Sequence, residues 1–385
     1  MHLPNYTDGS IVNLISSLLF AYGMENLYRP VRRLPIEQLQ KSTNIILFVI
    51  DGLGYEFLKH CSVDTVLKRH IQAKITSVFP STTATGITTF VTGKAPAQHA
   101  ITGWFMLLKE IGTVVRILPF YPRHGGDPLD SINITPDSFL TGMTIFERIG
   151  VDSYYLTPSF LCDSAYTRTT SRGAQTIYHS SLQDCLDKMA RIISSGKNKK
   201  CIYAYWAEFD SICHEFGTGS AQARTHVKDL GRAIAKFIDS IEGSSTTLLV
   251  TSDHGLIDTN PADCINMRDH PQLAETLALP LCGEPRVAYC YVRPSRVGKF
   301  REYVASKLAR YCTMHSSTDL IKKRFFGLHE HNERLFERVG DYVLIARKNY
   351  VIRDFVAGER EHFLRANHGG VSREEMYVPL INIKC

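Results

Sequence analysis

Five separate stretches of the chain are almost wholly apolar and rich in β-branched residues, and no other feature constrains the fold as much. They lie at residues 44–50, 74–79, 153–156, 201–206 and 246–251. Strands that are apolar along their whole length are buried on both faces, as in a parallel sheet covered by helices. Segments with helical spacing lie between them, at 86–92, 144–149, 182–193 and 221–241. The sequence therefore predicts an α/β core.

The length leaves room for more than this core. A chain of 385 residues holds two or three domains, or one large α/β domain with an insertion. Towards the C-terminus, a block of mixed strand-like and helix-like segments fills residues 286–360, and the apolar stretch 377–383 then has the pattern of a further strand. We expect a core formed by residues 1–285 and 361–385, with residues 286–360 inserted as a smaller cap domain.

The composition excludes several classes of protein. The apolar share is 44% and the charged share is 21%, which is typical of a folded globular chain rather than a disordered or fibrous one. With 44 Lys and Arg against 38 Asp and Glu, the net charge is +6. This excess is too small and too scattered for a protein that binds a nucleic-acid duplex. It is compatible with a small anionic substrate.

The cysteines and the N-terminal segment bear on the compartment. The ten cysteines include no CxxC pair, so we expect free thiols in a reducing compartment. The apolar stretch 11–20 has no cationic segment before it and is too short to span a membrane. We expect it to form a helix capped by Asp8 or Ser10. These features favour a cytoplasmic protein, with export by a route that needs no Sec-type signal peptide as the alternative. The sequence does not indicate an oligomeric state.

Acidic and imidazole residues follow two of the predicted strands. Asp51 ends the sequence NIILFVID, and Asp253 with His254 ends TTLLVTSDH. Ligand sites of open α/β sheets lie at the carboxyl ends of the strands, where such side chains can converge. Taken alone, each aspartate is more simply explained as a helix N-cap, and the histidine as a hydrogen-bonded core residue.

A third pair and a lone histidine complete the set. Asp210 and His214 stand four residues apart beyond the predicted strand 201–206, so on a helix they share a face and can bind one cation. His368 is followed by two glycines, which allow close approach of the backbone. A core histidine remains the simpler explanation of either one alone. Together, three carboxylates and three imidazoles are the complement of a two-zinc hydrolytic site.

Small hydroxyl residues gather in the segment FPSTTATG at residues 79–86, ahead of a predicted helix that leads to Thr92 and Gly93. A hydroxyl at a helix N-terminus lies where backbone N–H groups can bind an anion. An N-cap without chemistry is the simpler explanation of this segment by itself.

The order of these motifs resembles the type I phosphodiesterase and nucleotide pyrophosphatase family of the alkaline phosphatase superfamily. The resemblance runs from about residue 44 to residue 368. It implies an alkaline-phosphatase-like three-layer α/β/α core with a mostly parallel sheet and a smaller inserted cap. The superfamily's spacing to Gly93 implies Thr83 as the nucleophile, ahead of Ser81, Thr82 and Thr85.

The same resemblance implies the metals and the reaction. One zinc ion would be held by Asp210, His214 and His368. The other would be held by Asp51, Asp253 and His254, with the Thr83 oxygen facing it. The implied reaction is hydrolysis of a phosphodiester or nucleotide pyrophosphate bond in a small phosphorylated substrate, through a covalent phosphothreonine.

The chain departs from the family pattern in three places. The segment around Thr83 reads Phe-Pro-Ser-Thr-Thr, where nucleotide pyrophosphatases have Thr-Phe-Pro-Asn. Phe209 and Cys213 stand where the family has proline and glycine, and Trp104 stands where nucleotide pyrophosphatases have an asparagine that binds a phosphate oxygen. A phosphomonoesterase or phosphonate hydrolase of the superfamily is therefore the alternative, and a non-catalytic binding protein on this fold is a further one. Aromatic residues that could stack on a base, or could equally belong to the core, are Trp104, Phe105, Phe120 and Tyr121.

Overall fold

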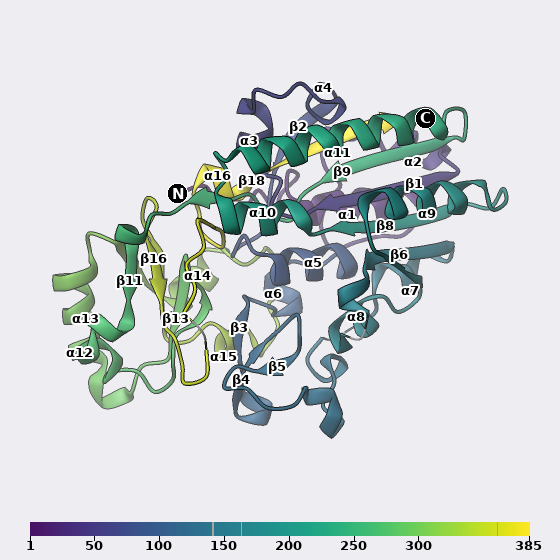
Figure 1. The fold of residues 1–385 in the computed structure, drawn as a ribbon. Helices are drawn as coiled ribbons and strands as arrows, with labels where there is room; N and C mark the ends of the chain where they lie inside the picture. The colour runs from purple at the N-terminus through teal and green to yellow at the C-terminus, as the bar shows by residue number, and fades with distance from the viewer. Residues whose placement is uncertain (141, 163, 360) are drawn as a thin grey trace.

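The computed structural model describes residues 1–140, 142–162, 164–359 and 361–385, so residue 360, the last of the predicted insertion, lies outside the described residues. The described residues form two seven-stranded sheets (Figure 1). The larger sheet runs in the order β2 (Ile71–Thr76), β18 (Tyr377–Lys384), β9 (Thr246–Thr251), β1 (Asn44–Ile50), β8 (Lys200–Trp206), β6 (Asp152–Pro158) and β7 (Gln175–His179). Only β18 runs antiparallel to its neighbours in this sheet, so the sheet is mostly parallel, as predicted.

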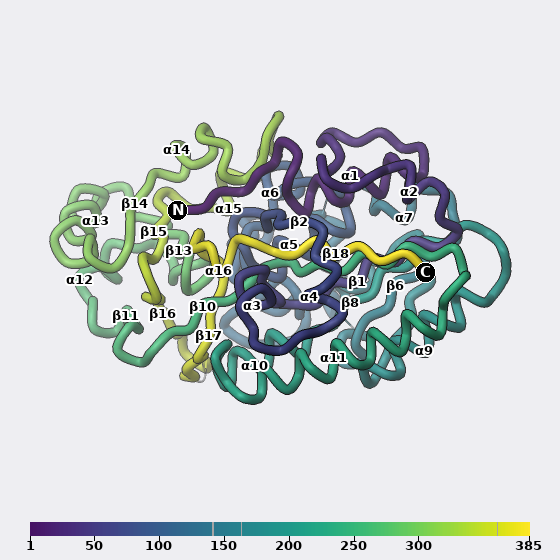
Figure 2. Tube along the Cα trace, turned by 90° about the horizontal axis from the view of Figure 1, so that it is seen from above, coloured from purple at the N-terminus to yellow at the C-terminus, as the bar shows by residue number. Residues whose placement is uncertain are grey.

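The larger sheet has a hydrophobic core on each of its two faces, and each central strand contributes side chains to both cores. In β1, Ile45 and Leu47 pack into one core, whereas Ile46 and Phe48 pack into the other. The first core is covered by α1 (Ile11–Ala21), α5 (Thr83–Thr92) and α7 (Ile145–Ile149), and the second by α9 (Leu182–Ser194) and α11 (Ala221–Ser240). In the view from above, α1 and α7 lie on one side of the strands and α9 and α11 on the other (Figure 2). The fold is the predicted three-layer α/β/α core.

The second sheet joins strands from distant parts of the chain. Its order is β14 (Cys312–Ser316), β15 (Tyr342–Ala346), β13 (Val287–Cys290), β12 (Cys282–Glu284), β3 (Phe105–Leu108), β4 (Thr113–Arg116) and β5 (Tyr121–Pro122). Strand β12 makes the junction, because it pairs with β13 on one side and with β3 on the other. The sheet thus combines three strands of the predicted insertion with a hairpin region at 105–122.

Two predicted elements differ in detail from those observed, and the first helix agrees with its prediction. The strand expected at 74–79 is β2, Ile71–Thr76, because the Ser77 and Phe79 amides bond to Met376 and Tyr6 outside the strand. Within the predicted insertion, the helix-like pattern at residues 297–311 forms α13 (Val297–Tyr303) followed by a wider helical turn at Val304–Leu308. The first helix starts after Ser10, one of the two expected caps. Within the described residues, no helix combines the length and the apolar character needed to cross a membrane.

The remaining elements are short. The helices are α2 (Ile36–Lys41), α3 (Tyr55–His60), α4 (Val66–Arg69), α6 (Pro96–His99), α8 (Ala165–Thr170), α10 (Glu208–Phe216), α12 (Pro271–Ala274), α14 (Ser317–Lys322), α15 (Leu335–Arg338) and α16 (Arg373–Met376). Two small ladders pair β10 (Ile257–Asp258) with β17 (Ala366–Asn367) and β11 (Cys264–Asn266) with β16 (Val351–Arg353).

Candidate active site

The residues singled out in the sequence come together at the carboxyl edge of the larger sheet. Strands β8, β1 and β9 are neighbours, and their carboxyl ends lead to Asp210, Asp51 and Asp253. Asp210 and His214 lie on α10, as the four-residue spacing predicts, and the Nε2 atom of His214 lies 3.0 Å from Oδ2 of Asp210. His368 arrives from the other end of the chain, on the loop after β17.

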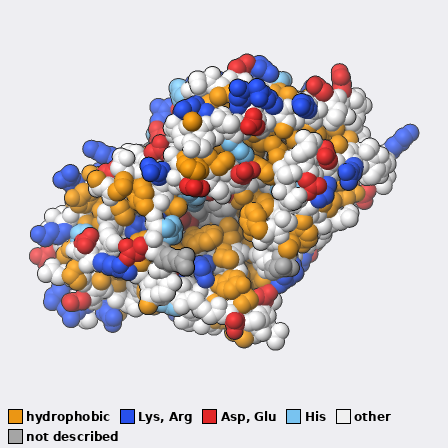
Figure 3. All heavy atoms as spheres, viewed as in Figure 1, with side chains coloured by type: hydrophobic (Ala, Val, Ile, Leu, Met, Phe, Trp, Pro, Cys, Tyr) orange, Lys and Arg blue, Asp and Glu red, His pale blue; other side chains and the backbone are white. Residues whose placement is uncertain are grey.

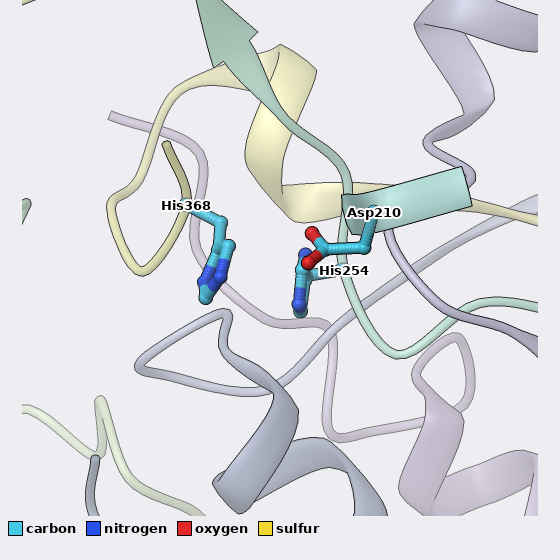
Figure 4. A group of neighbouring side chains, drawn as sticks. All are labelled: Asp210, His254 and His368. Atoms are coloured by element: carbon cyan, nitrogen blue, oxygen red, sulfur yellow. The ribbon is translucent and has the colours of Figure 1, made fainter. Parts of the chain in front are cut away.

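Two groups of side chains each offer three metal-ligating atoms within 4.8 Å of one another. One consists of Asp51, Asp253 and His254, and the other of Asp210, His254 and His368. His254 is common to both, with its Nε2 atom 3.2 Å from Oδ1 of Asp51 and its ring 3.9 Å from that of His368. The second group meets from three separate segments of the chain (Figure 4). His214 therefore joins this cluster through its contact with Asp210.

Hydrogen bonds to backbone carbonyl oxygens fix the orientation of two of the imidazoles. The Nδ1 atom of His214 lies 2.7 Å from the carbonyl oxygen of Ala366, and that of His254 lies 3.1 Å from the carbonyl oxygen of Gly255. Partners of this kind hold a ring so that its other nitrogen is free to bind a metal. In both residues this leaves Nε2 directed at the carboxylates.

Glycines permit the close approach of the segments that carry the ligands. A Cβ atom on Gly86 of α5 would lie 2.7 Å from Cβ of Asp253, and one on Gly255 would lie 2.0 Å from the backbone oxygen of Glu374. Real Cβ atoms essentially never come this close to another atom. Gly86 therefore allows α5 to touch Asp253, and Gly255 allows the Asp253 loop to touch α16.

The carboxylates carry an electrostatic conflict that a cation would relieve. Burial and the neighbouring Asp210 raise the pKa of Asp51, and burial and Asp51 raise the pKa of Asp253. Burial lowers the pKa of His214, but the adjacent Asp210 outweighs it and raises the value to about 9. Four buried ligand atoms lack a hydrogen-bond partner: Asp51 Oδ1, Asp210 Oδ1, Asp253 Oδ2 and His368 Nδ1. Unpaired buried atoms of this chemistry fit divalent cations.

The four hydroxyl residues around the start of α5 have different surroundings. The Ser81 hydroxyl donates to the carbonyl oxygen of Gly370 at 2.8 Å, and the Thr82 hydroxyl donates to Glu284 at 2.7 Å. The Thr85 hydroxyl is buried without a partner. Thr83 is the first residue of α5, and its Oγ1 atom lies 3.1 Å from Nε2 of His254. It is half-buried, whereas the other three are buried.

A cavity of about 730 Å³ opens over this edge of the sheet. Its wall includes Asp51, Thr83, Asp210, His214 and His368, with apolar side chains around them. The space-filling view shows a hollow near the middle of the molecule where apolar side chains gather (Figure 3). The cavity therefore gives the ligand cluster access to a molecule from solution.

The aromatic candidates divide between the cavity and the core. Trp104 and Phe105 line the cavity. Phe120 is 2% exposed and packs against the first core of the larger sheet.

The structure also brings in a carboxylate that the sequence did not indicate. Glu284 ends β12 and lines the cavity. One of its oxygens accepts the Thr82 hydroxyl and the backbone N–H of Trp104, both at 2.7 Å. Burial raises the pKa of Glu284 to about 7, against the opposing effect of these two hydrogen bonds. No motif surrounds this residue, because only the pairing of β12 with β3 brings it beside Thr82.

The family profile of type I phosphodiesterase / nucleotide pyrophosphatase matches residues 45–370, which is most of the chain. The chain belongs to this family. Membership supports a hydrolase of the phosphodiesterase/pyrophosphatase type within the alkaline phosphatase superfamily. A comparison with curated protein sequences finds no match.

Solved structures agree with the family at the level of the fold. Murine ectonucleotide pyrophosphatase/phosphodiesterase 5 has a TM-score of 0.65 at 17% identity and covers 87% of each chain. Human ectonucleotide pyrophosphatase/phosphodiesterase 5 has the same TM-score at 16% identity, and the alignment covers 88% of this chain and 87% of the human chain. Phosphonoacetate hydrolase from Sinorhizobium meliloti 1021 has a TM-score of 0.63 at 17% identity, covering 88% of this chain and 89% of its own. The murine protein was also solved as an inactive threonine-to-alanine variant with AMP.

Proposed function

We propose that this family member is a metal-dependent hydrolase of phosphodiester or nucleotide pyrophosphate bonds. The observation that carries the proposal is the gathering of three carboxylates, three imidazoles and one accessible threonine hydroxyl at a single edge of the sheet. Two zinc ions fit this donor set best, since imidazole and carboxylate ligands suit zinc. When bound, the cations would lower the pKa of the threonine hydroxyl and neutralise charge on the phosphoryl and leaving-group oxygens.

The residues that would hold the cations follow from the donor groups. We assign Asp210, His214 and His368 to one cation. We assign Asp51, Asp253 and His254 to the other, which Thr83 faces. The four buried ligand atoms that lack a hydrogen-bond partner support this assignment.

Thr83 is the proposed nucleophile. Its hydroxyl gives its proton to solvent, Oγ1 forms a bond to phosphorus, and the bond from phosphorus to the leaving-group oxygen breaks, with the electron pair staying on the leaving group. Water then cleaves the phosphothreonine and restores the hydroxyl. The first backbone N–H groups of a helix have no partner within the helix, so the N–H of Ala84 can donate to a non-bridging oxygen at the start of α5. Its backbone thus supplies part of the transition-state stabilisation.

Replacing Thr83 tests this role directly. Thr83→Ala should abolish turnover of bis-p-nitrophenyl phosphate while the metal content, measured by elemental mass spectrometry, stays at the wild-type value. Thr92→Ala is the matched control, because Thr92 lies at the far end of the same helix and its hydroxyl bonds to backbone atoms, donating to the carbonyl oxygen of Thr88 and accepting the N–H of Lys94. Turnover by Thr83→Ala at the wild-type rate would contradict the assignment.

A phosphonate or phosphomonoester substrate is the second candidate. It is favoured by Trp104, which stands at the position where nucleotide pyrophosphatases have asparagine and whose backbone N–H is already bonded to Glu284. Rates on bis-p-nitrophenyl phosphate, p-nitrophenyl phosphate and phosphonoacetate decide between the classes. A metal-loaded protein that turns over none of the three would instead be a binding protein on this fold.

A further inference from the structure

Three arginines line the same cavity as the proposed metal ligands, and they differ in how their charge is balanced. Arg123 is 3% exposed and fully paired. Its Nε and Nη2 atoms donate to the two carboxylate oxygens of Glu359 at 3.0 and 3.1 Å, and its guanidinium also donates to the carbonyl oxygens of Leu281 and Asp354. Its bonds hold the cavity wall together and leave it little capacity for a ligand.

Arg116 has no such partners. It is the last residue of β4, half-buried, with the ring of Tyr121 centred 5.7 Å from its guanidinium carbon. Its Nε atom is buried and makes no hydrogen bond. Within the described residues, no carboxylate lies within ion-pair distance of it. A buried donor without a partner is unfavourable in a native protein, and its presence beside a cavity calls for a partner from outside.

Arg353 is the second under-paired guanidinium. It is the last residue of β16, half-buried, and its Nη2 atom donates to the side-chain oxygen of Asn367 at 3.2 Å. Asn367 directly precedes His368. The described carboxylates leave this arginine, too, without an ion pair. Two guanidinium groups therefore line the cavity without an ion pair to a described carboxylate, and their charge is offset at longer range by Glu359 for Arg116 and by Glu284 for Arg353.

The two arginines come from other strands than the metal ligands. Arg116 comes from the second sheet and Arg353 from the ladder of β11 and β16, whereas the ligands follow the strands of the larger sheet or the loop after β17. Because Thr83 and both guanidinium groups line one cavity, a substrate with its phosphoryl group at Thr83 can present another part of the molecule to the arginines. The planar guanidinium binds carboxylate and phosphate oxygens in pairs.

We propose that Arg116 and Arg353 bind a second anionic group, a carboxylate or a phosphate, carried by the leaving group of the substrate. The inference rests on the proposed hydrolase function and narrows it to a substrate class: diesters, pyrophosphates or phosphonates whose departing fragment is itself negatively charged.

The test compares leaving groups that differ in charge. The reference substrate, p-nitrophenyl phenylphosphonate, has a leaving group without an additional charge. The carboxylate substrate is the same phosphonate with a carboxylated nitrophenol as leaving group. The phosphate substrate is ATP, which is cleaved to AMP and pyrophosphate. The wild-type kcat/KM should be at least about 10-fold higher on one anionic arm than on the neutral reference, which corresponds to one or two charge-assisted hydrogen bonds. The arm that shows the preference identifies the anion.

Variants then assign the preference to the arginines. Arg116→Met and Arg353→Met should each lower kcat/KM by about 10- to 100-fold on the preferred anionic substrate and by less than about 3-fold on the neutral one. Arg116→Lys keeps the charge and should retain part of the preference, which also guards against loss of folding in Arg116→Met. The matched control is Arg301→Met, on the exposed face of α13. This variant should leave kcat/KM unchanged on both the anionic and the neutral substrate.

The outcomes separate the two claims. Equal losses on neutral and anionic substrates, or no charge preference in the wild type, would overturn the leaving-group subsite and leave the hydrolase intact. Absence of turnover on every substrate by the metal-loaded wild type would overturn the proposed function itself.

Discussion

Replacing Glu375 by glutamine should destabilise the protein by about 3–5 kcal/mol, because it breaks a buried ion pair. The side chains of Glu375 and Arg286 are 0% and 1% exposed, and Arg286 donates to the carboxylate at 2.9 and 3.0 Å. The same carboxylate accepts the N–H groups of Gly370 and Ser372 at 2.8 and 3.2 Å. Loss of the charge leaves Arg286 buried and uncompensated, and it loosens the loop that carries His368.

The predicted change in Tm follows from the size of the chain. An unfolding entropy of about 2 cal/mol/K per residue gives about 0.8 kcal/mol/K for 385 residues, so the loss corresponds to a fall in Tm of about 4–6 °C. Calorimetry on the metal-loaded protein measures it. The double variant Arg286→Met with Glu375→Leu should recover most of the loss, since apolar groups often replace a buried pair without cost.

An exposed ion pair provides the matched control. Asp64 and Arg69 are 2.7 Å apart with side chains 70% and 56% exposed, so Asp64→Asn should shift Tm by less than about 1 °C. A Tm for Glu375→Gln that falls no further than that of Asp64→Asn would refute the reasoning. Burial alone would raise the pKa of Glu375, but Arg286 and the backbone donors hold it below its usual 4.5. The stabilisation is therefore present above pH 4.5 and is lost as the pH falls below that value.

Three further predictions concern the site. Burial raises the pKa of Glu284 from 4.5 to about 7, so the folded protein loses stability as the pH rises from 4.5 through 7 and this carboxyl ionises. Glu284→Gln cannot ionise, so it should raise the Tm of the metal-free protein at pH 8 but not at pH 4. Gly86→Ala should lower kcat, because its Cβ would lie 2.7 Å from Cβ of Asp253, whereas Gly298→Ala meets no atom within 4 Å and should leave kcat unchanged in the same assay. Chelation should lower Tm at pH 8, where the buried carboxylates lose their counter-charge, and added Zn²⁺ should restore it; a Tm indifferent to chelation would contradict a bound metal.

Local patterns were sufficient to predict the core of the fold. The apolar stretches 44–50 and 246–251 coincide with β1 and β9 residue for residue, because a strand buried on both faces carries mostly apolar and β-branched residues along its whole length. The i, i+4 spacing of Asp210 and His214 likewise predicts α10. In each case the signal lies within one segment of the chain.

The features that the sequence did not reveal depend on contacts between distant segments. The second sheet forms where Gly283 pairs with Phe105, and that pairing alone brings Glu284 beside Thr82. The buried Arg116 Nε without a hydrogen-bond partner could not be predicted for the same reason. A basic residue at the end of a strand is common, and the sequence does not show which groups surround it in the fold. Chemistry carried by one motif was therefore predictable, and chemistry assembled across the fold was not.

The stereochemical course of hydrolysis tests the central claim most directly. A phosphorothioate diester of known configuration at phosphorus, hydrolysed in heavy-oxygen water by the metal-loaded enzyme, yields a product whose configuration can be read by phosphorus NMR. Attack by Thr83 followed by attack of water is two in-line displacements, each with inversion, so the account predicts net retention. Net inversion would show that water attacks the substrate directly, and it would contradict a phosphothreonine intermediate.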